Sequence, residues 1–220
     1  IMPMAHASDG GGSIRIPASC CGLVGLKPSR GLNPRDPQIE TIISDFAVDH
    51  VVSRSVRDSA AALDAVCTCQ HASFLSGLDA APKPLKVAVV RSAMFGTSVT
   101  PEVRAALENA VRLMESLGHH LEDAEPQVDY AEFGMAFLLY WAISAKQALN
   151  SAQDLLGHPA SHQDVELTTW TLASVGSVVP EAEKAWAKAI IDRATRAFLN
   201  FSESFDVIMS PVLGSLPLRI

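Results

Sequence analysis

A serine that follows three glycines is the feature of this sequence that could do chemistry. The stretch SDGGGSIRIPASCC covers residues 8–21 and places Ser13 directly after Gly10, Gly11 and Gly12. Backbone N–H groups of a glycine-rich turn can converge on a negatively charged oxygen, and the missing side chains leave room for a carbonyl group to approach. The pattern suggests acyl transfer, with Ser13 as the nucleophile and the amides of the three glycines as an oxyanion hole.

Other interpretations of the same stretch stay open from the pattern alone. A GGGS string is typical of a flexible linker, although this one runs directly into an apolar segment that contains Pro17. A phosphate-binding loop would end in Gly-Lys-Ser or Gly-Lys-Thr, whereas Ile14 and Arg15 follow the serine. The nucleophile elbow of α/β-hydrolases needs a glycine two residues after the serine, where this chain has Arg15. A Ser-His-Asp arrangement with His6 has no support from its spacing.

Composition narrows the class of protein. The 220 residues are 48% hydrophobic and 19% charged, which is typical of a folded globular chain. The formal net charge is -7 and no cluster of Lys and Arg occurs, so a nucleic-acid partner is not expected. The longest apolar run, residues 133–145, is too short to cross a bilayer, so no membrane partner is expected. The cysteines lack zinc-ligand spacing, which predicts reduced thiols, a cytoplasmic protein and no metal.

Strands alternate with helices along the rest of the chain. This order predicts an α/β fold, a layered mixed β-sheet covered by helices. The clearest helix is expected at residues 101–117, because Thr100 can cap it and Gly118 suits its exit. Residues 14–31 are expected to form short extended segments and residues 31–50 a loop. The remaining expected elements are helices within 53–67, 129–150 and 180–204, strands at 85–92, 119–126 and 205–211, and linkers at 81–84 and 157–164.

The stretch around the serine resembles the signature of the amidase signature family, whose members carry an Asp-x-Gly-Gly-Ser-Ile-Arg-x-Pro core. The residues that match are Ser8, Asp9, Gly11, Gly12, Ser13, Ile14, Arg15, Pro17, Cys21, Gly22, Gly25, Lys27 and Pro28. The resemblance continues over the segments 52–66, 85–92, 99–126 and 205–217, and is weakest at 130–180. Within the family, the stretch is most similar to bacterial amidases of the 6-aminohexanoate-cyclic-dimer hydrolase kind. The fold implied is the amidase signature α/β/α fold.

The resemblance implies a Ser-Ser-Lys triad in which Ser13 becomes acylated. The family's base is an unprotonated lysine that acts through a second serine, and burial must depress the pKa of that lysine. In the family both groups lie upstream of the signature, whereas the first lysine of this chain, Lys27, matches a structural Lys-Pro. Ser8 is expected to hydrogen-bond within the catalytic cluster. Asp9 and Arg15 are expected to pair and to hold the turn.

The expected organisation is a single amidase-signature domain over residues 1–220. Because the chain starts with Ile and stops without a helix-closing signal, we expect it to be truncated at both ends and inactive alone. The expected function is hydrolysis of a linear or cyclic non-peptide carboxamide through an acyl-enzyme on Ser13. The expected substrate is a small amide, with no cofactor, and a homodimer is allowed. Two alternatives remain: a non-catalytic amidase-fold binding or assembly subunit, and a glutamyl-tRNA amidotransferase A-type subunit.

Overall fold

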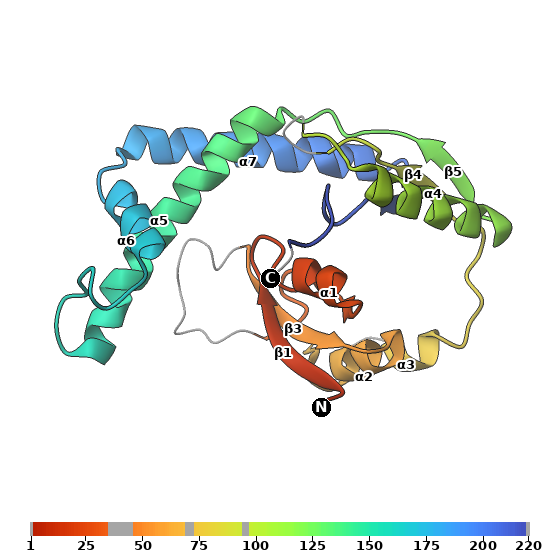
Figure 1. The fold of residues 1–220 in the computed structure, drawn as a ribbon, viewed down its shortest axis with the longest axis horizontal. Coiled ribbons are helices and arrows are strands. Elements are labelled where there is room, and N and C mark those ends of the chain that lie inside the picture. The colour runs from red at the N-terminus through yellow and green to blue at the C-terminus, as the bar shows by residue number, and fades with distance from the viewer. Residues whose placement is uncertain (1, 35–45, 69–72, 94–96, 219–220) are drawn as a thin grey trace. The chain divides into compact units, whose positions relative to one another are not determined.

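The computed structural model describes residues 2–34, 46–68, 73–93 and 97–218. Figure 1 shows its helices and strands, coloured along the chain from red at the N-terminus to blue at the C-terminus. The chain divides into two compact units, the first made of Ile1–Ile39, Phe46–Glu125 and Ser202–Ile220, the second of Glu40–Asp45 and Pro126–Phe201. None of the described helices is both long and apolar enough to cross a membrane. The single-domain organisation stays a prediction.

An antiparallel sheet in the first unit carries the glycine stretch. Its strands lie in the order β1-β3-β2. β1 (Met4–Asp9) pairs along its whole length with β3 (Val48–Ser53), and β2 (Val24–Gly25) pairs with the other edge of β3. α2 (Val56–Val66) packs against β3 and confirms the helix expected within 53–67. Its N-cap is Ser55, whose side chain accepts the N–H of Asp58. The short helix α3 (Phe74–Gly77) follows.

A parallel sheet in the same unit has the strand order β5-β4-β6. The central strand β4 (Lys86–Val89) is flanked by β5 (His120–Asp123) and β6 (Val207–Met209). α4 (Pro101–Ser116) connects β4 to β5 and buries Leu107 and Val111 against Val89. The expected helix at 101–117 and the three strands of this sheet are therefore confirmed. Thr100 occupies the N-cap position, but its side chain makes no capping hydrogen bond.

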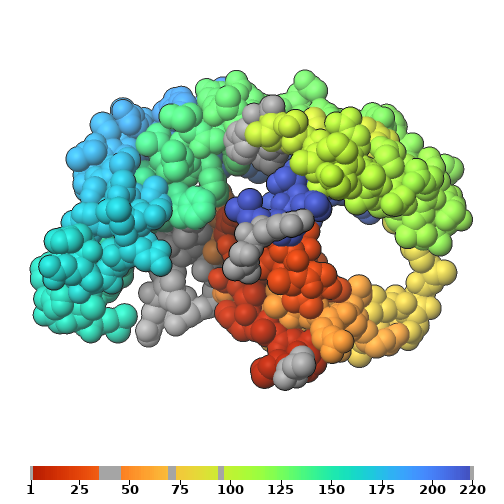
Figure 2. Space-filling model, viewed as in Figure 1, coloured from red at the N-terminus to blue at the C-terminus, as the bar shows by residue number. Residues whose placement is uncertain are grey.

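The second unit consists of helices α5 (Tyr130–Leu156), α6 (Leu167–Gly176) and α7 (Glu181–Ser202). α5 and α6 pack closely, because Gly176 lets α6 approach the backbone of Ala142. In the space-filling view these two helices touch without a visible gap (Figure 2). The two long helices are confirmed. α6 was not predicted, since LTTWTLASVG shows no apolar stripe along one face.

Two expectations in the first 53 residues are wrong. Residues Arg15–Cys21 form the helix α1 instead of an extended segment. Pro17 lies in its first turn, where N–H groups have no acceptor within the helix, and Gly22 ends it with a φ of 64°. Residues 48–50, expected as loop, begin β3, because β1 supplies their hydrogen-bond partners from a distant part of the chain. Residues 35–45 of the expected loop lie outside the described residues.

The α/β class is confirmed. The strands of the described residues form two three-stranded sheets, one antiparallel and one parallel. In the parallel sheet, α4 provides the long crossover that the parallel strands β4 and β5 need.

Candidate active site

Asp9 fixes the glycine turn from the end of β1. Its side chain is 0% exposed. Oδ1 accepts the N–H of Gly12 at 2.6 Å, and Oδ2 accepts the N–H of Ile14 at 3.2 Å and of Arg15 at 3.3 Å. The first N–H groups of a helix have no acceptor within the helix, so an outside acceptor is needed. A single carboxylate therefore closes the turn and starts α1.

Arg15 holds the same carboxylate from the other side. Its Nε donates to Oδ2 of Asp9 at 2.9 Å and its Nη2 donates to Oδ1 at 2.9 Å, which is a two-point ion pair. Burial alone would raise the pKa of the Asp9 carboxyl, but the hydrogen bonds from Arg15 and from the Gly12 amide outweigh it and hold that pKa well below its usual range. The carboxylate therefore stays charged at neutral pH. The expected pairing of the two side chains is present.

Gly12 is required for the shape of the turn. Its φ is 128°, a conformation that favours glycine, and a Cβ at this position would lie 2.6 Å from Cδ1 of Ile16. Its carbonyl oxygen accepts the N–H of Ile16 at 2.7 Å. Because its own N–H donates to Asp9, Gly12 is not available here as an oxyanion donor. The expected oxyanion hole therefore depends on the other amides of the turn.

Those other amides belong to Gly10, Gly11 and Ser13. Gly11 and Ser13 are exposed, while Gly10 is half-buried and lies beside Ala47. Within the described part of the chain, the N–H groups of Gly11 and Ser13 have no protein acceptor. The turn thus presents a serine hydroxyl and neighbouring N–H groups on a rigidly held backbone. This arrangement can attack a carbonyl carbon and stabilise the oxygen that becomes negative.

Three residues near the turn in the sequence, Ser8, Lys27 and His6, make contacts outside the turn. Ser8 lies in β1 opposite Asp49, and its hydrogen bond in a catalytic cluster stays a prediction. The Nζ of Lys27 donates to the carbonyl oxygen of Pro28 at 3.2 Å, and burial together with the charge of Arg15 lowers the pKa of Lys27. His6 lies in β1, with its Nε2 3.7 Å from Oδ1 of Asp49. These contacts suit structural roles.

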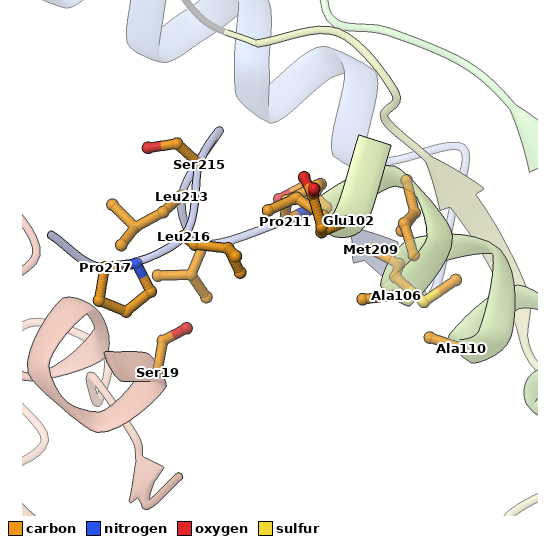
Figure 3. A pocket seen from close by; sticks show the side chains of 14 residues that line it. Ser19, Glu102, Ala106, Ala110, Met209, Pro211, Leu213, Ser215, Leu216 and Pro217 are labelled. Carbon is orange, nitrogen blue, oxygen red and sulfur yellow. The ribbon is translucent and has the colours of Figure 1, made fainter. Parts of the chain in front are cut away.

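A cavity of about 330 Å³ lies between α4 and residues 209–217. Figure 3 shows Ala106 and Ala110 on α4, with Ser19 of α1 near the other end of the cavity. Its lining is mostly aliphatic, and Ser13 is not among the lining residues. Within the described ranges, no group of three or more His, Cys, Asp or Glu side chains could hold a metal ion.

Gly25 matches the family signature, but the sequence did not indicate its packing role close to the turn. A Cβ at Gly25 would lie 2.6 Å from the Cβ of Ala18 on α1. The sequence signal was GLVGL, in which the second glycine falls in an apolar run. An isolated glycine in a strand often marks the close approach of another backbone.

Comparison with known proteins gives the family. A family model described as Amidase matches residues 1–220. The chain is 36% identical over 227 residues to a Mycobacterium leprae protein that carries the name amidase AmiC. It is 32% identical over 186 residues to the 6-aminohexanoate-cyclic-dimer hydrolase of Pseudomonas sp. (strain NK87). These matches cover 100% and 78% of this chain, but 47% and 38% of the relatives, so the chain spans less than half the length of these two relatives.

Solved structures share the fold. The structure of 6-aminohexanoate cyclic dimer hydrolase superposes with a TM-score of 0.81 at 28% identity, over 92% of this chain and 45% of that chain. A bacterial aryl acylamidase of the amidase signature family gives a TM-score of 0.89 at 20% identity, over 99% of this chain and 47% of that chain. The second likeness shows the fold alone.

Proposed function

Because the chain belongs to the amidase family, we propose that the full-length protein hydrolyses a carboxamide through an acyl-enzyme on Ser13. The observation that supports this most is the turn that Asp9 and Arg15 hold together. It leaves the residues Gly11 and Ser13 exposed. A hydroxyl nucleophile next to fixed backbone N–H donors is what acyl transfer requires.

In the proposed reaction, Oγ of Ser13 forms a bond to the amide carbon while the carbonyl π electrons move onto the oxygen. The N–H groups of Gly10, Gly11 and Ser13 stabilise the resulting oxyanion. The C–N bond then breaks, the amine leaves with a proton, and water hydrolyses the Ser13 ester to release the acid. By resemblance, a lysine acting through a second serine moves the protons, and we assign neither group to a residue of this chain.

We propose a non-peptide linear or cyclic amide as the substrate class. A relative named 6-aminohexanoate-cyclic-dimer hydrolase is 32% identical over 78% of the chain, and an Enterococcus faecalis relative named lipoamidase is 32% identical over 97% of it. A cytoplasmic location is part of the proposal, because Cys20, Cys21 and Cys67 are free thiols. A homodimer stays a prediction that analytical ultracentrifugation can check.

The test uses a fluorophosphonate probe on the full-length protein, with peptide mass spectrometry to locate the adduct. We expect the adduct on Ser13, and we expect Ser13→Ala to lose both the adduct and the hydrolysis of a panel of linear and cyclic amides. Ser29→Ala, which removes another exposed serine after α1, is the matched control. This variant should keep both the probe adduct on Ser13 and the amide hydrolysis. A folded protein with neither adduct nor hydrolysis would instead favour the non-catalytic subunit.

A further inference from the structure

We infer that Gly25 is a positioning residue for Ser13, an inference that rests on the proposed role of Ser13 as nucleophile. The missing side chain at Gly25 sets how closely α1 lies on β2. The position of α1 in turn sets where the glycine turn holds the serine hydroxyl.

The contact between α1 and β2 is one that only glycine permits. A Cβ at Gly25 would lie 2.6 Å from the Cβ of Ala18 and 2.9 Å from the carbonyl oxygen of Ile14. Ala18 is 2% exposed and Ile14 is 0% exposed, so neither residue can turn toward solvent. Gly25 is not among the glycines with positive φ, so an alanine there would be strained by these contacts alone.

The connection from α1 to β2 cannot absorb a shift by lengthening. Gly22, with a φ of 64°, ends the helix, and its N–H donates to the carbonyl oxygen of Ala18. The N–H of Leu23 donates to the same oxygen at 2.8 Å. Ala18 is therefore held by the turn that follows it as well as by its contact with Gly25.

The turn and the helix are anchored to two strands that share β3. Asp9 at the end of β1 accepts the N–H groups of Gly12 and Ile14. Gly25 in β2 lies so close to Ile14 that an added Cβ would be 2.9 Å from its carbonyl oxygen. Asp9 lies opposite Val48 and Gly25 lies opposite Val52, so both anchors are fixed to one central strand. A displacement of α1 relative to β2 must then be taken up by the turn that carries Ser13.

The size of the displacement can be worked out from the contact. Gly25→Ala must open the distance to the Ala18 Cβ from 2.6 Å to the 3.4 Å of an ordinary contact, a shift of about 0.8 Å. A misplacement of about 1 Å can slow an enzymatic reaction by about 100-fold. The shift moves the nucleophile together with the N–H groups proposed to stabilise the oxyanion, and both act in the transition state. We therefore expect kcat to fall by this order while KM changes little.

Two readouts on the full-length protein test the inference. The first is hydrogen exchange in the segment 10–16 by mass spectrometry, which reports on the N–H groups held by Asp9 and needs no activity. The second is kcat and KM for amide hydrolysis. We expect Gly25→Ala to speed exchange in 10–16 and to lower kcat. Gly77→Ala, where nothing lies within 4 Å of the added Cβ, should change neither.

Ala18→Gly added to Gly25→Ala removes the 2.6 Å contact and should restore part of kcat and of the exchange protection. The rescue should be incomplete, because the Ile14 oxygen remains 2.9 Å from the new Cβ. If Gly25→Ala alone does not fold, the double variant is compared with Ala18→Gly.

Exchange in 10–16 and kcat that match the Gly77→Ala control would overturn the inference, as would a double variant that recovers nothing. A wild-type protein that hydrolyses no amide would refute the proposed function instead, and the exchange measurement would still test the role of Gly25.

Discussion

Replacing Asp9 by asparagine should loosen the glycine turn more than a surface substitution in the same unit. Asp9 accepts five hydrogen bonds, three from backbone N–H groups and two from the Arg15 guanidinium. An asparagine side chain has one acceptor oxygen, and its NH₂ group would face N–H donors. Asp9→Asn therefore leaves two or three of these donors without an acceptor, and it removes the negative charge that pairs with Arg15.

The structure sets the size of the effect. A buried donor without an acceptor costs about 1–3 kcal/mol, and removing one partner of a buried ion pair costs about 3–5 kcal/mol. The Arg15 side chain is 46% exposed, so water can solvate part of the guanidinium. We therefore expect the lower end of the ion-pair range, a loss of about 3 kcal/mol in the local unfolding free energy at pH 7.

The stabilisation that the Asp9 carboxylate provides depends on pH. The pKa of Asp9 in the folded protein is held well below its usual range, so the stabilisation is complete above the unfolded pKa of about 3.9. It is lost as the pH falls from there toward the folded pKa. The difference between wild type and Asp9→Asn should therefore shrink below about pH 4.

The assay must report on the first unit. Trp141, Trp170 and Trp186 all lie in the second unit, so tryptophan fluorescence would not follow the turn. We would instead measure the urea dependence of hydrogen exchange in residues 4–21. The control is Asp79→Asn, which removes an exposed 3.5 Å pair with Arg57 and should stay within about 0.5 kcal/mol of wild type. An Asp9→Asn variant as stable as this control would refute the role of the carboxylate.

Other substitutions test the packing around the site and in the second unit. Ser59→Ala removes the 3.1 Å hydrogen bond to Nε2 of the buried His50 and should cost about 1–2 kcal/mol, measured by urea-dependent exchange in 46–66. Burial lowers the pKa of His50 in the folded protein. The stability that depends on a neutral His50 is therefore complete above the unfolded pKa of about 6.5 and is lost as the pH falls below it. Melting curves at stepwise lower pH should show this loss in wild type and not in His50→Gln. Gly176→Ala places a Cβ 2.1 Å from the carbonyl oxygen of Ala142 and should destabilise the α5–α6 contact by about 1–3 kcal/mol, followed by tryptophan fluorescence, with Gly77→Ala as the neutral control.

The parallel sheet and its helix could be predicted because each element carries its own signal. α4 has an apolar stripe, a proline in its first turn and a glycine after its end. The antiparallel sheet could not be predicted in the same way. β1 reads MAHASD, which has neither large β-branched residues nor a clear alternation, and it becomes a strand because β3 pairs with it.

Part of the candidate site could be predicted from the sequence. The resemblance gave the place of Ser13 and the pairing of Asp9 with Arg15. It did not give the path of the backbone, so the donation from the Gly12 amide to Asp9 was missed. Pro17 also misled, since a proline near a glycine stretch favours an extended segment unless it falls in the first turn of a helix.

The most direct measurement is the trapping of the acyl-enzyme. The full-length protein is mixed with an amide substrate that it hydrolyses, quenched in acid during turnover and digested for mass spectrometry. We predict a mass increase equal to the acyl group on the peptide that contains Ser13, and no such peptide in Ser13→Ala. An acyl group on another residue, or turnover that continues in Ser13→Ala, would contradict the assignment of Ser13 as the nucleophile.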